Sequence, residues 1–127
     1  MSDLPSGFIV AVVDDDQGVL RALQCLLESA DHEVRVFRSG AEFLDSGCLP
    51  LVDGLISDID MPGIDGFELL RRVESMRPGL PMILITGYPE TLNRLAPFEG
   101  RHRIFTKPFE GPALLAAMGD EIRRLRK

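Results

Sequence analysis

Cysteine is scarce in this chain of 127 residues, and its two cysteines, Cys25 and Cys48, have no CxxC or CxxH spacing. Their scarcity argues against a disulfide framework and against a zinc site. Long hydrophobic runs are also missing, because the longest unbroken apolar run, residues 8–13, is far too short to span a membrane. The opening residues MSDLPSG lack the basic and apolar regions of a signal peptide. We therefore expect a cytoplasmic protein with no membrane partner.

Positive charge is outnumbered, with 14 lysines and arginines against 20 aspartates and glutamates, which gives a formal net charge of -6. This balance disfavours direct nucleic acid binding and suits the binding of cations. The length predicts one domain over residues 1–127, with a structured core over about 7–125. No repeat, low-complexity tract or linker interrupts it.

Five short segments predict β-strands. Residues 8–13, 51–57 and 81–86 are apolar runs rich in β-branched residues, as expected of strands that are buried on both faces. Residues 32–37 alternate in polarity like a partly exposed strand, and residues 102–107 form a weaker candidate.

Helices are predicted between these strands. Apolar residues keep helical spacing over 19–30 and 115–125. Two more helices begin at capping boxes, in which a serine or an aspartate precedes a glutamate by three positions. The boxes are Ser39 with Glu42 and Asp65 with Glu68. The segment 88–100 contains two prolines and few repeating apolar residues, so the fourth helix of the series is predicted to be short or irregular.

Strict alternation of strands and helices predicts an α/β fold, in which parallel strands are joined by right-handed crossovers. We expect a five-stranded parallel sheet in the order 2-1-3-4-5, with helices on both faces. In such sheets, ligands gather at the carboxyl ends of the strands. The side chains at these ends are Asp14, Asp15, Asp58, Thr86 and Lys107.

The order 2-1-3-4-5 makes the first and third strands neighbours, so Asp14 and Asp15 are expected to face Asp58. Two carboxylates ~4 Å apart repel by roughly 4 kcal/mol at an effective dielectric of 20, so such a cluster takes up a proton or a cation. Oxygen ligands without histidine or cysteine favour Mg²⁺, with Mn²⁺ as the substitute. A carboxylate beside Mg²⁺, with a hydroxyl and an ammonium group nearby, is typical of a phosphoryl-transfer site. Asp58 is the candidate nucleophile.

The whole pattern resembles the receiver domain of two-component response regulators, which has a flavodoxin-like fold. The resemblance rests on the acidic pair, on D-x-x-M-P-x-x-x-G beginning at Asp58, on T-G at Thr86 and on K-P-F at Lys107. It implies that Asp58 accepts phosphate, and that Thr86 and Lys107 bind the phosphoryl oxygens. It also implies a cis bond between Lys107 and Pro108.

The same resemblance implies a metal site and a set of partners. Asp15, Asp58 and the Asp60 backbone carbonyl would ligate Mg²⁺, and Asp14 would hold a metal-bound water. The phosphate donor would be a sensor histidine kinase or a phosphotransfer protein, and the recipient of the signal a downstream output protein or domain. A homodimer on activation is a further expectation. We expect a signalling switch that assists its own phosphorylation and dephosphorylation, not a metabolic enzyme.

Three positions depart from the family pattern or vary within it. Family members usually carry a tyrosine or phenylalanine three residues before the lysine, where this chain has Ile104, so the usual coupling of threonine and aromatic ring is in doubt. Tyr88 and Asp60 stand two positions after Thr86 and Asp58, where side chains can border the phosphate. We expect both to tune its lifetime, with Tyr88 shielding it from water.

Two other functions stay open at this point. A phosphatase of the haloacid dehalogenase type is suggested by D-x-D in ISDID, but that family needs this motif near the N-terminus and the acidic pair after it. A pseudo-receiver would keep the fold and work without phosphate. The cysteines and histidines are expected to have no functional role. Cys25 is expected to be buried, Cys48 to be partly exposed, and both histidines to lie at the surface.

Overall fold

The structure is a computed structural model that describes residues 7–88, 90 and 103–125. Its elements, in chain order, are β1 (Ile9–Val13), α1 (Gln17–Ser29), β2 (Glu33–Phe37), α2 (Gly40–Asp45), β3 (Gly54–Asp58), α3 (Gly66–Met76), β4 (Met82–Thr86), β5 (Arg103–Thr106) and α4 (Gly111–Leu125). All neighbouring strands are parallel, and the sheet has the order β2-β1-β3-β4-β5. The predicted fold class and strand order are therefore confirmed.

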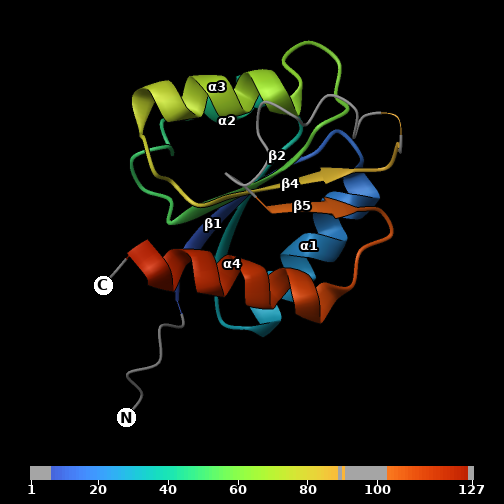
Figure 1. The fold of residues 1–127 in the computed structure, drawn as a ribbon, viewed down its shortest axis with the longest axis vertical. Helices are drawn as coiled ribbons and strands as arrows, with labels where there is room; N and C mark the ends of the chain where they lie inside the picture. The colour runs from blue at the N-terminus through green and yellow to red at the C-terminus, as the bar shows by residue number, and fades with distance from the viewer. Residues whose placement is uncertain (1–6, 89, 91–102, 126–127) are drawn as a thin grey trace.

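The sheet is the middle of three layers, as Figure 1 shows, with α2 and α3 on one side and α1 and α4 on the other. Alternate strand residues feed two apolar cores, because successive side chains point to opposite faces of a sheet. Ala11 and Leu55, for example, belong to the core under α2 and α3, whereas Val10 and Ile56 belong to the core over α1 and α4. β3 and β4 are buried along their whole length, which explains their continuous apolar sequence.

The predicted strand 51–57 begins later than expected, at Gly54. The amides of Leu51 and Val52 both donate hydrogen bonds to the carbonyl of Cys48, so this part of the apolar run forms a turn. Gly54 itself packs tightly, because a Cβ there would lie 2.6 Å from the sulfur of Met118 in α4. The apolar run is therefore only partly strand.

Three helices that begin near the carboxyl edge of the sheet, α1, α2 and α3, have a side-chain cap. The Asp65 carboxylate accepts from the amide of Glu68, and the Ser39 hydroxyl accepts from the amide of Glu42, as predicted. For α1 the cap is Asp16, whose carboxylate accepts from two amides of the first turn. Asp16 thus takes over helix capping, which leaves the two aspartates before it available for the edge of the sheet.

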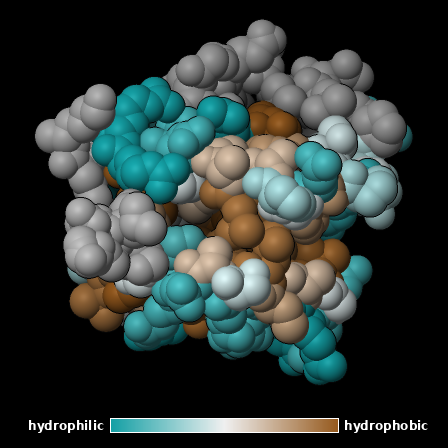
Figure 2. Space-filling model, turned by 90° about the horizontal axis from the view of Figure 1, so that it is seen from below, coloured by the Kyte–Doolittle hydropathy of each residue, from teal (hydrophilic) through white to brown (hydrophobic). Residues whose placement is uncertain are grey.

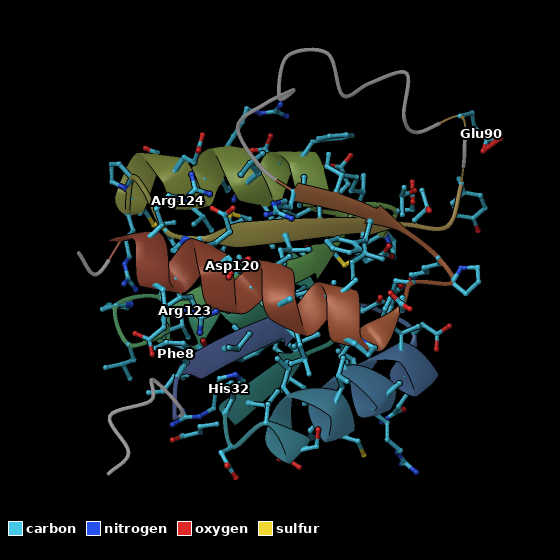
Figure 3. The ribbon with its side chains drawn as sticks, turned by 60° about the horizontal axis from the view of Figure 1, so that its bottom comes forward. Phe8, His32, Glu90, Asp120, Arg123 and Arg124 are labelled. Atoms are coloured by element: carbon cyan, nitrogen blue, oxygen red, sulfur yellow. The ribbon has the colours of Figure 1, made fainter. Side chains whose placement is uncertain are left out.

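Two expectations about individual side chains are wrong. Cys25 is exposed, because it lies off the face of α1 that carries the buried Leu23 and Leu27. His32 is half-buried, and Figure 3 shows it beside Phe8, on which it stacks with ring centroids 5.4 Å apart. Burial lowers the pKa of His32, so its ring is neutral at pH 7. Cys48 is partly exposed, as expected.

Several sequence-based expectations lie outside the described residues, namely most of the segment 88–100 and His102. Within the described part of the chain, no helix combines the length and apolar character needed to cross a membrane. Figure 2 shows the face formed by α1 and α4, where apolar residues gather in the middle with hydrophilic residues around them.

Candidate functional site

The carboxyl edge of the sheet brings the predicted polar residues together. Asp58 and Thr86 are the last residues of β3 and β4, and Asp14 and Lys107 directly follow β1 and β5. Backbone hydrogen bonds hold the two flanking residues in line with the sheet: the Asp14 amide donates to Phe37, and the Lys107 amide donates to the carbonyl of Thr86 at 2.7 Å. Strand pairing therefore fixes the spacing of all four side chains.

Three carboxylates meet at this edge. Asp14, Asp15 and Asp58 each offer one oxygen, and these three atoms lie within 4.8 Å of one another. Asp14 and Asp58 are buried, at 1% and 3% exposure, whereas Asp15 is exposed. The cluster therefore has a closed side toward the protein and an open side toward solvent.

Lys107 is the cation of the site. Its ammonium nitrogen lies 3.3 Å from Oδ2 of Asp14 and 3.4 Å from Oδ1 of Asp58. Burial alone would lower the pKa of Lys107, but the two carboxylates outweigh it and hold the pKa above its usual value. The bond between Lys107 and Pro108 is cis, as expected.

One ammonium group does not neutralise this cluster. Burial, followed by the charge of Asp14, raises the pKa of Asp58 to about 6, against the pull of Lys107. Burial also raises the pKa of Asp14, although the Asp16 amide donates a hydrogen bond to its Oδ1 at 2.9 Å. The buried oxygens Oδ2 of Asp14 and Oδ1 of Asp58 accept no hydrogen bond from the described residues. The single positive charge of Lys107 and the available hydrogen-bond donors therefore do not balance the carboxylates of the site.

This donor set fits a hard divalent cation. Carboxylate oxygens are the ligands that Mg²⁺ prefers, and Mg²⁺ keeps several of its waters, which the exposed side at Asp15 can accommodate. Within the described residues, no histidine or cysteine joins the cluster, which disfavours zinc. The two unbonded buried oxygens are the atoms that such an ion would satisfy.

Thr86 is fully buried, and its hydroxyl already has partners. It donates to Oδ2 of Asp60 at 2.6 Å and accepts from the amide of Tyr88 at 3.1 Å. Nothing in the local sequence indicates the bond to Asp60, because the direction of that side chain depends on the turn after β3. The side chain of Tyr88 is exposed, at 59%.

The turn after Asp58 passes close to the start of α3. A Cβ on Gly66 would lie 2.6 Å from the carbonyl oxygen of Asp58 and 2.6 Å from Cα of Ile59. The Gly66 amide also donates to the Ile59 carbonyl. The glycine of the D-x-x-M-P-x-x-x-G motif is thus needed for this backbone approach.

Ile104 lies on β5, two residues before Thr106, which pairs with Thr86. Its side chain is partly buried and packs on the core under α2 and α3, whereas Phe105 packs on the opposite core. An aliphatic side chain, paired with Leu84 in the sheet, therefore occupies the position where the family pattern expects a ring.

Comparison with known proteins identifies the family. Residues 10–119 match the family described as the response regulator receiver domain. The chain is a response regulator receiver domain. This receiver is 37% identical, over 98% of its length, to the C4-dicarboxylate transport transcriptional regulatory protein DctD of Rhizobium meliloti (strain 1021), of which it covers 27%. It is 34% identical over 95% of its length to the transcriptional regulatory protein FixJ of Azorhizobium caulinodans, of which it covers 58%.

Solved structures agree with this assignment. The receiver superposes with a TM-score of 0.83 on a response regulator receiver domain protein from Clostridium thermocellum, at 28% identity over 94% of this chain and 97% of that one. Full-length FixJ from B. japonicum gives a TM-score of 0.80 at 32% identity over 94% of this chain and 59% of that one. The receiver therefore corresponds to a part of its longer relatives.

Two side-chain contacts at the site were not predicted from the sequence, although Asp60 itself was named as a site residue. The capping of α1 by Asp16 had a signal in the sequence, because Asp16 precedes the helical pattern that begins near Val19. The Asp60 carboxylate as the partner of Thr86 had none, since the two residues are 26 positions apart on neighbouring strand ends.

Proposed function

We propose that this receiver is a phosphoacceptor, with Asp58 as the residue that is phosphorylated. The observation that supports this most strongly is the environment of Asp58, a buried carboxylate with a pKa of about 6 beside Lys107 and two further carboxylates. Structural ion pairs are normally neutral overall, whereas this cluster has excess negative charge and unbonded oxygens. Such an arrangement suits a site that binds a cation and a phosphoryl group.

The reaction is a transfer of a phosphoryl group between two residues. A carboxylate oxygen of Asp58 attacks phosphorus, the bond from phosphorus to the phosphohistidine nitrogen breaks, and the imidazole leaves with the electron pair. Asp58 becomes an acyl phosphate. Thr86 and Lys107 donate hydrogen bonds to the phosphoryl oxygens, and Lys107 balances their charge.

The metal site is proposed to hold Mg²⁺, or Mn²⁺ in its place. Asp15, Asp58 and the backbone carbonyl of Asp60 would bind it, and Asp14 would hold one of its waters. When bound, the ion supplies charge neutralisation for the attacking and transferred oxygens. The receiver in this way assists its own phosphorylation and dephosphorylation.

The proposed partners follow from the relatives and from the surface beside the site. A groove between the start of α1 and the loop after β5 is lined by the apolar Val19, Ala22, Pro108 and Phe109, together with Asp16, Gly18 and Lys107. Its apolar lining beside the cluster supports docking of a sensor histidine kinase or phosphotransfer protein in the cytoplasm. The phosphorylated receiver would act on an output protein or domain, with a homodimer as one active form.

Intact mass spectrometry tests the proposal. The receiver is incubated with a small acyl phosphate donor in the presence of Mg²⁺ or EDTA, in parallel with Asp58→Asn. A stable adduct that requires both Mg²⁺ and Asp58 is expected. Absence of the adduct would contradict the proposal and favour a pseudo-receiver, and continuous turnover of phosphomonoesters would favour a phosphatase.

A further inference from the structure

The bond between Thr86 and Asp60 joins the proposed phosphate-binding hydroxyl to a carboxylate outside the metal cluster. Thr86 Oγ1 and Asp60 Oδ2 are 2.6 Å apart, which is the length of a charge-assisted hydrogen bond from a hydroxyl. Thr86 is fully buried and Asp60 partly so. The contact is therefore shielded from water on the threonine side.

A hydroxyl has one proton, so it donates one full hydrogen bond at a time. The Thr86 hydroxyl directs its short bond at Asp60, and a weaker contact reaches the Tyr88 carbonyl at 3.3 Å. Its oxygen meanwhile accepts from the Tyr88 amide. To donate to a phosphoryl oxygen on Asp58, Thr86 must give up the bond to Asp60.

Asp60 also acts on Asp58 directly. The charge of Asp60 contributes to the raised pKa of Asp58, although burial and Asp14 contribute more. The two carboxylates are thus close enough to repel each other, and a phosphorylated Asp58 adds negative charge. The Asp60 carboxylate accordingly competes with the phosphoryl oxygens for the proton of the Thr86 hydroxyl.

We propose that the Asp60 carboxylate is a restraint that holds Thr86 in the unphosphorylated state and slows phosphorylation of Asp58. This inference rests on the proposed function of Asp58. The restraint acts through the proton of Thr86, so Asp60 is a positioning residue and makes no contact with the incoming phosphate. It also controls Thr86 without an aromatic ring on β5, where this chain has Ile104.

The first test measures the bond without phosphate. Unfolding by urea in EDTA is compared for the wild type, Asp60→Ala, Thr86→Val and the double variant. Valine keeps the shape of threonine and removes the hydroxyl, and Thr86→Ala replaces it if the valine variant does not fold. A coupling of roughly fivefold or more in the folding equilibrium is expected for a hydrogen bond to a charged group. Additive effects would overturn the inference.

The second test measures phosphorylation rates with Mg²⁺ and a small acyl phosphate donor. Asp60→Ala is expected to react about tenfold faster than the wild type, because the hydroxyl no longer has a competing acceptor. In the Thr86→Val background the same change should accelerate the reaction much less, because only the charge of Asp60 then acts on Asp58. An equal acceleration in both backgrounds would overturn the inference, since it would show that Asp60 acts by charge alone.

Asp60→Asn is the matched control for charge. Asparagine is neutral but still offers a carbonyl oxygen to Thr86, so we expect a rate between those of the wild type and Asp60→Ala. Equal rates for the asparagine and alanine variants would again overturn the restraint. If no variant and no wild-type protein takes up phosphate, the proposed function fails, whereas the unfolding comparison in EDTA still decides whether Asp60 holds Thr86.

Discussion

The ammonium nitrogen of Lys107 lies 3.4 Å from Oδ1 of Asp58, an oxygen that accepts no hydrogen bond from the described residues. The same ammonium group also faces Asp14, so it is shared between two buried carboxylates. A shared cation stabilises each carboxylate less than a dedicated partner would. The charge that makes this edge of the sheet suitable for a metal and a phosphoryl group therefore destabilises the metal-free fold.

Removing that charge should stabilise the metal-free protein at neutral pH. The pKa of Asp58 is about 6 in the fold and about 3.9 in an unfolded chain, so the folded state binds more protons between these values. Stability then falls as the pH rises through this window, and the full cost is present above pH 6. Asp58→Asn should be more stable than the wild type by about 1–3 kcal/mol at pH 7.5 in EDTA, with the difference disappearing near pH 4.

Urea unfolding between pH 4 and pH 8 measures this difference. Asp120→Asn is the control, because Asp120 is an exposed partner of Arg123, labelled with it in Figure 3. Its substitution should change the free energy of unfolding by less than about 0.5 kcal/mol at every pH. An Asp58→Asn variant that is less stable than the wild type at pH 7.5 would contradict the electrostatic account.

Magnesium should stabilise the fold in a pH-dependent manner. Binding to the folded state alone raises the free energy of unfolding by about 1.4 kcal/mol when the free ion is at ten times its Kd. Protons compete for Asp58 below its pKa of about 6, so the rise in melting temperature with Mg²⁺ should be smaller at pH 5.5 than at pH 7.5.

The same measurement distinguishes the roles of the acidic residues that follow β1. Asp15→Asn should greatly reduce the shift with Mg²⁺, because it removes the exposed carboxylate of the cluster. Asp16→Asn should keep the shift, since Asp16 caps α1 and asparagine caps helices equally well. A reduced shift in Asp16→Asn but not in Asp15→Asn would reverse this assignment.

The fold was predictable because its signals are local. Apolar runs, capping boxes and their alternation determine the order of strands and helices, and parallel pairing then brings Asp14, Asp58 and Thr86 to one edge. Only the family resemblance, not spacing, predicted the cis bond before Pro108. The site was predictable in outline for the same reason: its residues follow directly from the ends of strands.

Contacts that depend on the path of a turn were not predictable. The guanidinium of Arg77 donates to the carbonyls of Leu49 and Val52, which are 28 and 25 residues away, and nothing in the local sequence indicates this. The bond from Thr86 to Asp60 is of the same kind. The prediction that Cys25 is buried is wrong because its apolar neighbours in the sequence do not determine its direction, and the position lies off the buried face of α1.

A methyl group at Gly66 should damage the fold and the site together. Its nearest neighbours would be the backbone atoms of Asp58 and Ile59 at 2.6 Å, which cannot move without shifting the end of β3. Gly66→Ala should lower the free energy of unfolding by about 2–3 kcal/mol and slow phosphate uptake at Asp58.

Gly119→Ala is the matched control for this prediction. Gly119 also lies within a helix, but a Cβ there would meet the guanidinium group of Arg123, the far end of an exposed and flexible side chain. The alanine variant should therefore be equally stable or more stable by about 0.5–1 kcal/mol, in line with helix propensity. Equal losses for both variants in thermal and urea unfolding would contradict the role of close approach at Gly66.

Tyr88 offers a test of how water reaches the phosphate. Its backbone amide donates to the Thr86 hydroxyl, whereas the residue as a whole is 59% exposed. Loss of the ring in Tyr88→Ala should shorten the lifetime of the Asp58 phosphate about threefold, because water then reaches the phosphorus more readily. Tyr88→Phe keeps the ring and should retain the wild-type lifetime. Phosphate retention followed by intact mass after removal of the donor measures both, and equal or longer retention in Tyr88→Ala would refute shielding by the ring.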